Sequence, residues 1–258
     1  MIINLIYRKI NNLKKNDIKL LIIPFLYIFL FSIFIYFKPF LKFSLYSPSK
    51  NYLPNIIILI VLFSSYILYA IASRYLTNKN TFKITIIFLV LISSVSLFSY
   101  PLGSGDLFVY TSQAREFSVF KLNPYYNTYE DQNIDPHKDS LLNYWSDEVS
   151  VYGPFFILIA GLLAKINSSS LIFTLFIFKI FFSIINIGNL ILIKKITNNN
   201  LAVYLYGFCP VILFEFLVNA HNDVLLIFFI LLSFLFLKKE ANLKNYSLAL
   251  LFLIISFF

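Results

Sequence analysis

Long apolar runs recur along the whole chain and limit the folds that it can adopt. Each of several runs of about 18–25 residues is long enough to cross a hydrocarbon core about 30 Å thick as a helix. Of the residues, 59% are hydrophobic and 13% are charged, whereas soluble domains are about 45–50% apolar and about 25% charged. A β-barrel would show shorter segments of alternating hydrophobicity. The sequence therefore predicts an all-α, polytopic transmembrane protein.

The runs predict about seven spans in one integral-membrane domain, 1–258. The last run is about fourteen residues long, shorter than the roughly seventeen that a span needs, so we expect an N-terminal fragment or an unusually short C-terminus. Residues 18–100 would form the first three spans, 101–166 an external acidic loop with surface helices, and 169–258 the remaining spans. The expected spans are 18–37, 54–75, 82–100, 169–193, 201–219, 222–237 and 245–258.

Charged residues near the span ends predict the orientation of the chain. Lysine and arginine collect on the cytoplasmic side of membrane proteins, and the segment before the first span contains Arg8, Lys9, Lys14, Lys15 and Lys19. The N-terminus is therefore expected in the cytoplasm of a bacterial cell, and the 101–151 loop outside its plasma membrane. This loop contains eight of the twelve acidic residues: Asp106, Glu116, Glu130, Asp131, Asp135, Asp139, Asp147 and Glu148.

The net charge of +9 does not indicate nucleic-acid binding. The lysines stand between apolar runs, where they act as topology signals. The expected surroundings of the chain are membrane lipids, with no nucleic-acid partner. The single cysteine, Cys209, excludes an internal disulfide and a cysteine-based zinc site.

The stretch VYGPFFILIAGLLAKI, 151–166, decides on which side the later polar residues lie. It has about fifteen apolar residues, fewer than a span usually contains. If it nevertheless crossed the membrane, Asp106 and Asp223 would lie on opposite sides. We favour a short helix at the membrane surface, which places Asp106 and Asp223 on the same aqueous face.

An aspartate follows a glycine-rich turn where the third span ends. Gly103 and Gly105 flank Ser104 and would allow a sharp turn. Asp106 comes next, and a helix cap or a solvated charge is one interpretation. The other is a carboxylate at the membrane surface that accepts a proton from an attacking hydroxyl, or binds a divalent cation such as Mg²⁺ or Mn²⁺.

A second polar cluster interrupts the apolar sequence in EFLVNAHNDVLL. Its members are Glu215, Asn219, His221, Asn222 and Asp223. Ionisable residues in or beside spans are costly and are functional candidates by default. A simple turn would explain Asn222 and Asp223, but not Glu215. The His and Asp side chains suit a metal site, a phosphate or hydroxyl site, or a general base, and spacing alone does not choose among these.

Lys179 and two tyrosine-rich segments complete the set of candidates. Lys179 lies in the middle of an apolar run, where it would extend to the interface, pair with Glu215 or face a polar pocket. A cation there would suit the phosphate of a lipid-linked donor. The segments KLNPYYNTY and VYGPF fit both an interfacial aromatic belt and contacts with sugar rings.

The order of four elements resembles the GT-C superfamily of integral-membrane glycosyltransferases. The closest likeness is to the polyprenol-phosphate-mannose-dependent α-1,6-mannosyltransferases of bacterial envelopes. It covers about residues 95–235, with Tyr-Gly-Pro in place of the commoner Tyr-Pro-Pro. The matching residues are Asp106 and Tyr110, then Asn123, Pro124 and Tyr125, then Tyr152, Gly153 and Pro154, and finally Pro210, Glu215, His221, Asn222 and Asp223.

The resemblance implies an inverting transfer of a sugar, mannose in that subfamily, on the outer face of the membrane. The donor would be a polyprenyl-phosphate sugar, and the acceptor a hydroxyl of an envelope glycan or lipid. Asp106 would be the catalytic carboxylate, as a base or a metal ligand, and Asp223 with His221 would form the second pole of the site. The substrate-binding residues would be Tyr110, Asn123, Tyr125, Tyr152, Lys179, Glu215 and Asn222.

Two other classes of protein remain open on the sequence alone. In a multi-pass transporter, Lys179 and Glu215 would line a substrate path, although the internal repeats common in transporters are not apparent. The other class is a non-catalytic membrane subunit. The long acidic loop favours an enzyme over both.

Overall fold

The computed structural model describes residues 15–37, 53–74, 80–102, 104–131, 133–141 and 145–257. The regular elements of these residues are helices, which confirms the predicted all-α class for this part of the chain. They are α2 (Lys15–Phe37), α3 (Leu53–Ala72), α4 (Thr81–Ser96), α5 (Asp106–Ser118), α6 (Lys138–Leu141), α7 (Pro154–Ile166), α8 (Leu171–Thr197), α9 (Asn200–Gly207), α10 (Pro210–Leu213), the π-helix η1 (Phe214–Val218), α11 (Asp223–Leu237) and α12 (Leu243–Phe257).

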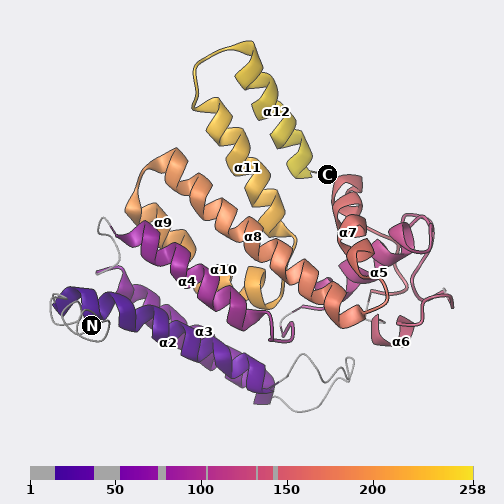
Figure 1. Ribbon diagram of the computed structural model, residues 1–258, viewed down its shortest axis with the longest axis horizontal. Coiled ribbons are helices and arrows are strands. Elements are labelled where there is room, and N and C mark those ends of the chain that lie inside the picture. The colour runs from indigo at the N-terminus through magenta and orange to yellow at the C-terminus, as the bar shows by residue number, and fades with distance from the viewer. Residues whose placement is uncertain are drawn as a thin grey trace, which may run out of the picture.

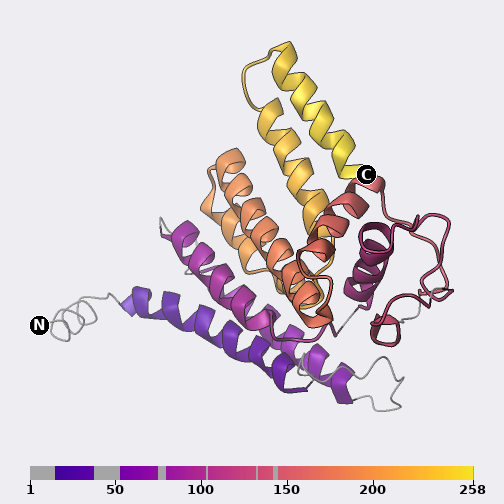
Figure 2. The ribbon, with the colours of Figure 1, turned by 45° about the vertical axis from the view of Figure 1, so that its right-hand side comes forward.

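The long helices form a fan, and the segment between α4 and α8 stands at one end of it (Figures 1 and 2). Helix α2 packs against α3 and α4, and α4 packs against α8 and α9. Helix α11 packs against α8 and pairs with α12 as a hairpin. Helices α5 and α7 pack together, beside the α6 segment. Two apolar clusters result, one around α2, α4 and α9 and one around α5, α7 and α8.

Each predicted span corresponds to a helical segment, but seven spans are not confirmed. Among the residues that the structure describes, one helix, Leu171–Thr197, is long and apolar enough to cross a membrane. A second candidate arises if Asn200–Gly207 and Pro210–Val218, bent by 50°, are counted together. The other apolar helices are shorter over the residues whose side chains are described, for example Ile22–Phe34 in α2 and Ile56–Ala72 in α3. The predicted basic residues before residue 15 lie outside the described residues, so the orientation of the chain stays a prediction.

Helices α4 and α8 run in opposite directions. Thr85, near the start of α4, lies beside Gly207 and Leu190, whereas the end of α4 lies beside Lys179 in the third turn of α8. The chain therefore leaves α4 and enters α8 on the same side of the fan. The intervening α7 packs against α5 and α8, and the position of 151–166 at the membrane surface stays a prediction.

Lys179 is a buried link between α8 and the end of α4. Its Nζ donates hydrogen bonds to the carbonyl oxygens of Ser96 and Ser99, each at 2.7 Å, and lies 3.3 Å from Ser99 Oγ. Only 1% of the residue is exposed. The last carbonyls of a helix lack intrahelical partners and attract cations. Lys179 thus fixes the junction from which α5 emerges, and its predicted contact with a donor phosphate stays a prediction.

A buried ion pair organises the segment that joins α5 to α7. Arg115 Nε and Nη2 donate to the two carboxylate oxygens of Asp135 at 2.6 and 2.8 Å, and Nη1 donates to the carbonyl of Ser168 at 2.6 Å. Tyr129 Oη also donates to Asp135, at 2.7 Å. A bidentate arginine–carboxylate pair is geometrically specific, so these contacts fix the acidic segment against α5 and the start of α8.

Replacing Asp135 should destabilise the protein markedly. In Asp135→Ala the Arg115 guanidinium keeps its burial but loses its anion, and breaking a buried pair in this way costs about 3–5 kcal/mol. Thermal unfolding of the purified variant in detergent would measure the loss. The matched control is Asp147→Ala, because Asp147 is exposed in the same segment. Equal unfolding temperatures for the two variants would contradict this account of the ion pair.

Candidate active site

Asp106 is the first residue of α5, and its carboxylate faces the polar cluster that precedes α11. Ser104 Oγ accepts the Asp106 N–H at 3.0 Å. An acidic residue in the first turn is also favourable to a helix, but the N-cap of α5 is Gly105, so Asp106 is not the cap and its functional role stays a prediction. Gly105 does not need the conformational freedom of a glycine, because its φ is −88° and an added Cβ would meet no atom within 4 Å. Gly103 lies outside the described residues.

The residues before α11 form a compact turn after the π-helix η1. His221 N–H donates to the carbonyl of Glu215 at 3.0 Å, and Ala220 has a positive φ of 58°. This left-handed conformation is uncommon for a residue with a side chain. It reverses the chain within two residues of Asn222 and directs His221 back toward Glu215.

Asn219 joins the two halves of the site. Its Oδ1 accepts the N–H of Leu102 at 3.0 Å, and its Nδ2 donates to Glu215 Oε2 at 2.9 Å. Asn219 is fully buried, so these bonds fix the turn before α5 against η1. The sequence placed Asn219 among the polar residues of its segment but not in the predicted site, because its partner Leu102 is 117 residues away in the chain.

His221 lies among three carboxylates. Its Nδ1 is 3.0 Å from Asp106 Oδ2 and 3.8 Å from Asp223 Oδ2, and its Nε2 is 3.2 Å from Glu215 Oε2. A carboxylate faces each ring nitrogen, an arrangement that suits an imidazolium donating from both. The structure thus brings together Asp106, His221 and Asp223, the three predicted catalytic residues, with Glu215.

The contacts of His221 shift two pKa values in opposite directions. The hydrogen bond from His221 lowers the pKa of Asp106 against the effect of burial, and Ser104 adds to the lowering. The same bond raises the pKa of His221, and the charges of Asp106, Glu215 and Asp223 add to it. The Asp106 contribution to stability is lost as pH falls through its lowered pKa. The His221 contribution is complete below about pH 6.5 and is lost as pH rises through its raised pKa.

Two tyrosines close the site on the side of α5. Tyr110 Oη donates to Asn222 Oδ1 at 3.1 Å, and the Asn222 N–H lies 3.3 Å from the same Oη. Burial raises the pKa of Tyr110, so the phenol stays protonated and acts as a donor. The ring of Tyr152 packs edge-on against that of Tyr110, with centroids 5.0 Å apart. Tyr110, Tyr152 and Asn222, all predicted as substrate-binding residues, therefore adjoin the carboxylates.

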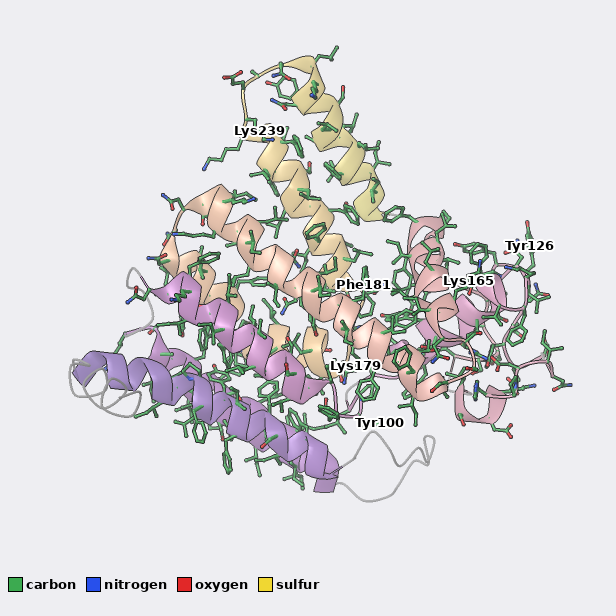
Figure 3. The ribbon with its side chains drawn as sticks, in the orientation of Figure 1. Tyr100, Tyr126, Lys165, Lys179, Phe181 and Lys239 are labelled. Carbon is green, nitrogen blue, oxygen red and sulfur yellow. The ribbon has the colours of Figure 1, made fainter. Side chains whose placement is uncertain are left out.

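The other predicted substrate-binding residues lie further from the acids. Tyr125 Oη donates to the carbonyl of Tyr152 at 2.9 Å, and Asn123 Oδ1 accepts the Tyr125 N–H at 3.0 Å. These contacts place the pair behind Tyr152, where it lines a separate cavity. Lys179 contacts the end of α4, as described above, and Figure 3 shows its position beside the ribbon of α8.

A small cavity of about 180 Å³ opens beside Asp223, between the start of α7 and the α11–α12 hairpin. One part of its wall is polar, formed by Tyr152, Asn222 and Asp223. The rest is apolar and includes Phe155, Leu225, Phe229 and Ile255. The Asp223 side chain is 63% exposed. The cavity thus gives this carboxylate an opening that has a polar end and an apolar wall.

The described residues do not fit a metal site as they are arranged. Among them, no group of three or more His, Cys, Asp or Glu side chains is disposed to hold a metal ion. His221 occupies the space between Asp106 and Glu215, where its own positive charge compensates them. The predicted Mg²⁺ or Mn²⁺ ion stays a prediction.

A family profile described as alpha-(1->6)-mannopyranosyltransferase, N-terminal domain, matches residues 46–257. The chain belongs to this family. The match confirms the resemblance to α-1,6-mannosyltransferases that the four sequence elements indicated, and it includes every predicted site residue of the chain. No curated protein and no solved structure gives a significant match. As a member of a mannosyltransferase family, the chain is associated with glycosyl transfer.

In this mannosyltransferase-family chain, Asp106→Asn should lower the pKa of His221 toward the ordinary value of about 6.5. Asp223→Asn should lower it less, because Asp223 lies 3.8 Å from Nδ1 and Asp106 lies 3.0 Å away. The chain has two histidines, so NMR of the protein labelled at the histidine ring follows both, and His221→Gln assigns the signals. Identical His221 titrations in Asp106→Asn and the unsubstituted protein would contradict the observed geometry.

Proposed function

We propose that this chain transfers mannose from a polyprenyl-phosphate donor to a hydroxyl of an envelope glycan or lipid. The reaction takes place at the outer face of a bacterial plasma membrane, in a GT-C-type fold. The family match supports mannosyl transfer. The observation that carries the mechanism is the contact of Asp106 with His221, itself flanked by Glu215 and Asp223.

The proposed reaction is a single displacement at the anomeric carbon. The acceptor oxygen forms the new bond, and the bond between the anomeric carbon and the donor phosphate oxygen breaks. The phosphate leaves with the bonding electron pair and needs no proton, because it is a stable anion. The acceptor hydroxyl loses one proton, which Asp106 accepts. Attack opposite to the leaving group inverts the configuration of the anomeric carbon.

The neighbours of Asp106 hold it ready for this step. His221 orients one carboxylate oxygen, Oδ2, by the 3.0 Å contact. Glu215 holds the opposite ring nitrogen of His221, and Asn219 holds Glu215. A positioned carboxylate within hydrogen-bond reach of the hydroxyl meets the geometric requirement for a general base. Asn222, held by the buried hydroxyl of Tyr110, lines the cavity beside Asp223, where it offers a hydrogen-bonding partner to a sugar ring.

The positions of Lys179 and Glu215 do not support a transporter. In a transporter, these two charged residues would line a common substrate path. Lys179 is instead buried against the carbonyls of Ser96 and Ser99, whereas Glu215 contacts His221 and Asn219.

Asp106→Asn should reduce mannosyl transfer by about 10²–10⁴-fold, the usual contribution of a general base. The amide keeps the size of the side chain but does not accept the hydroxyl proton. Membranes containing equal amounts of each variant would be assayed with a polyprenyl-phosphate mannose donor. The matched control is Asp139→Asn, an exposed aspartate of the same segment, which should transfer normally. Normal transfer by Asp106→Asn would remove the mechanism.

The proposed sidedness predicts opposite labelling of two exposed positions. Tyr126 lies in the segment between α5 and α6, and Lys239 lies in the α11–α12 turn (Figure 3). In a Cys209→Ser background, Tyr126→Cys should react with an impermeant maleimide on intact cells, whereas Lys239→Cys should react only after lysis. Labelling of Lys239→Cys on intact cells, or no labelling of Tyr126→Cys there, would contradict the proposed sidedness.

A further inference from the structure

A larger cavity lies away from the carboxylates, between the end of α5 and the start of α7. Its volume of about 440 Å³ falls within the range of about 300–1,000 Å³ that is usual for small-molecule sites. It lies behind Tyr125, so Tyr152 separates it from Tyr110 and the acids. Its wall is mostly apolar and includes Phe117, Leu122, Pro124, Pro154, Ile157 and Leu158.

Two lysines lie together at the end of the α5–α7 pair. Lys121 lines the cavity, has a φ of 61° and donates from Nζ to the carbonyl of Ser118 at 2.8 Å. The nearby charge of Lys165, in the last turn of α7, lowers the pKa of Lys121. The packing of α5 against α7 also places the two lysines near each other. A Cβ at Gly161 would lie 3.1 Å from Ser118 Cβ, and Lys121 follows Ser118, as Lys165 follows Gly161, by about one helical turn. Both lysines are exposed.

An exposed apolar stripe continues along α7 beside this pair. Leu158, Leu162 and Ile166 are 52%, 67% and 62% exposed. Their spacing of four residues places them on one face of the helix. A short helix with an apolar face and neighbouring lysines fits the interfacial region of a bilayer, where basic residues attract anionic head groups.

We infer that the cavity and the lysine pair bind an anionic glycerophospholipid of the surrounding bilayer. Its phosphate lies between the ammonium groups of Lys121 and Lys165, and an acyl chain occupies the cavity and follows the stripe on α7. The two like charges explain why the head group is anionic, and the apolar wall explains why the ligand is a lipid rather than a free phosphate.

This lipid is distinct from the proposed sugar donor. Helix α5 has 13 residues between Asp106 and Ser118, and a rise of about 1.5 Å per residue gives it a length of about 20 Å. A phosphate at Lys121, beyond the far end of α5, therefore lies too far from Asp106 for its sugar to react there. The bound lipid instead holds α5 and α7 at the interface, with Tyr125 connecting its cavity to Tyr152.

The test compares two lipids with identical acyl chains, phosphatidylglycerol and phosphatidylcholine. Native mass spectrometry of the full chain in detergent would measure the fraction of protein that retains each lipid during titration. The unsubstituted protein should retain phosphatidylglycerol in preference. The double variant Lys121→Gln/Lys165→Gln should weaken phosphatidylglycerol binding by about tenfold or more and leave phosphatidylcholine binding unchanged.

Three controls separate this site from general charge attraction. Lys194→Gln/Lys195→Gln removes an equal charge at the far end of α8 and should preserve binding. Leu158→Trp fills the cavity wall while keeping both lysines, and should weaken binding. Glycerol 3-phosphate, which lacks acyl chains, should not displace the lipid.

Thermal unfolding would verify that each variant folds. The inference is overturned if the Lys121/Lys165 variant binds phosphatidylglycerol like the unsubstituted protein, or loses no more than the Lys194/Lys195 variant. Equal retention of the two lipids, or full displacement by glycerol 3-phosphate, would overturn it as well. Because the readout is lipid retention, a failure here leaves the proposed sugar transfer untouched, and loss of transfer in Asp106→Asn says nothing about this cavity.

Discussion

The contact of His221 with Asp106 and Glu215 is the interaction on which the candidate site depends. It joins the start of α5 to the turn before α11, two segments that are far apart in the chain. A second bond between the same segments, from Tyr110 to Asn222, links residues 112 positions apart. Removing a charged group from water is costly unless a partner compensates it. The half-buried imidazole and carboxylates therefore stabilise one another, and loss of one leaves the others with an uncompensated charge.

Two buried polar side chains make this contact geometrically reliable. Lys179 binds the carbonyls of Ser96, the last residue of α4, and of Ser99 just beyond it. Asn219 binds both Leu102 and Glu215. Lys179 fixes the position at which the chain leaves α4. Asn219 fixes the segment before α5 against η1. Neither residue needs to touch a substrate to matter, because an error of an ångström at either junction would separate Asp106 from His221.

The sequence predicted the helices well because the length of an apolar run is a local property. It located α8 at 169–193, against Leu171–Thr197 in the structure, and α11 at 222–237, against Asp223–Leu237. It treated 201–219 as one span and missed the bend between α9 and α10, although Pro210 at the start of α10 is a helix-initiating signal. The π-helix and the positive φ of Ala220 had no comparable signal, because tertiary contacts impose them.

The candidate site was predictable in its members but not in its pairings. Asp106 and His221 each stand out as polar residues beside apolar runs, yet no local pattern says that one faces the other. Lys179 stood out for the same reason, but its observed partners are backbone carbonyls, which a sequence does not display as candidates. The sequence did not identify Lys121 and Lys165 as a candidate binding pair, because only the packing of α5 against α7 brings these two surface lysines together.

The charge of the cluster bears on how two substrates would share it. Three carboxylates surround one imidazolium, so the cluster keeps a net negative charge when His221 is protonated. A hydroxyl benefits from a carboxylate that accepts its proton, whereas a phosphate is repelled by the exposed carboxylate of Asp223. In the proposed reaction the acceptor hydroxyl therefore belongs at Asp106, and the donor phosphate must approach on the side where His221 offsets the acids. Deprotonation of His221 would strengthen the repulsion of the donor, so the raised pKa of His221 extends to higher pH the range over which the site admits an anionic substrate.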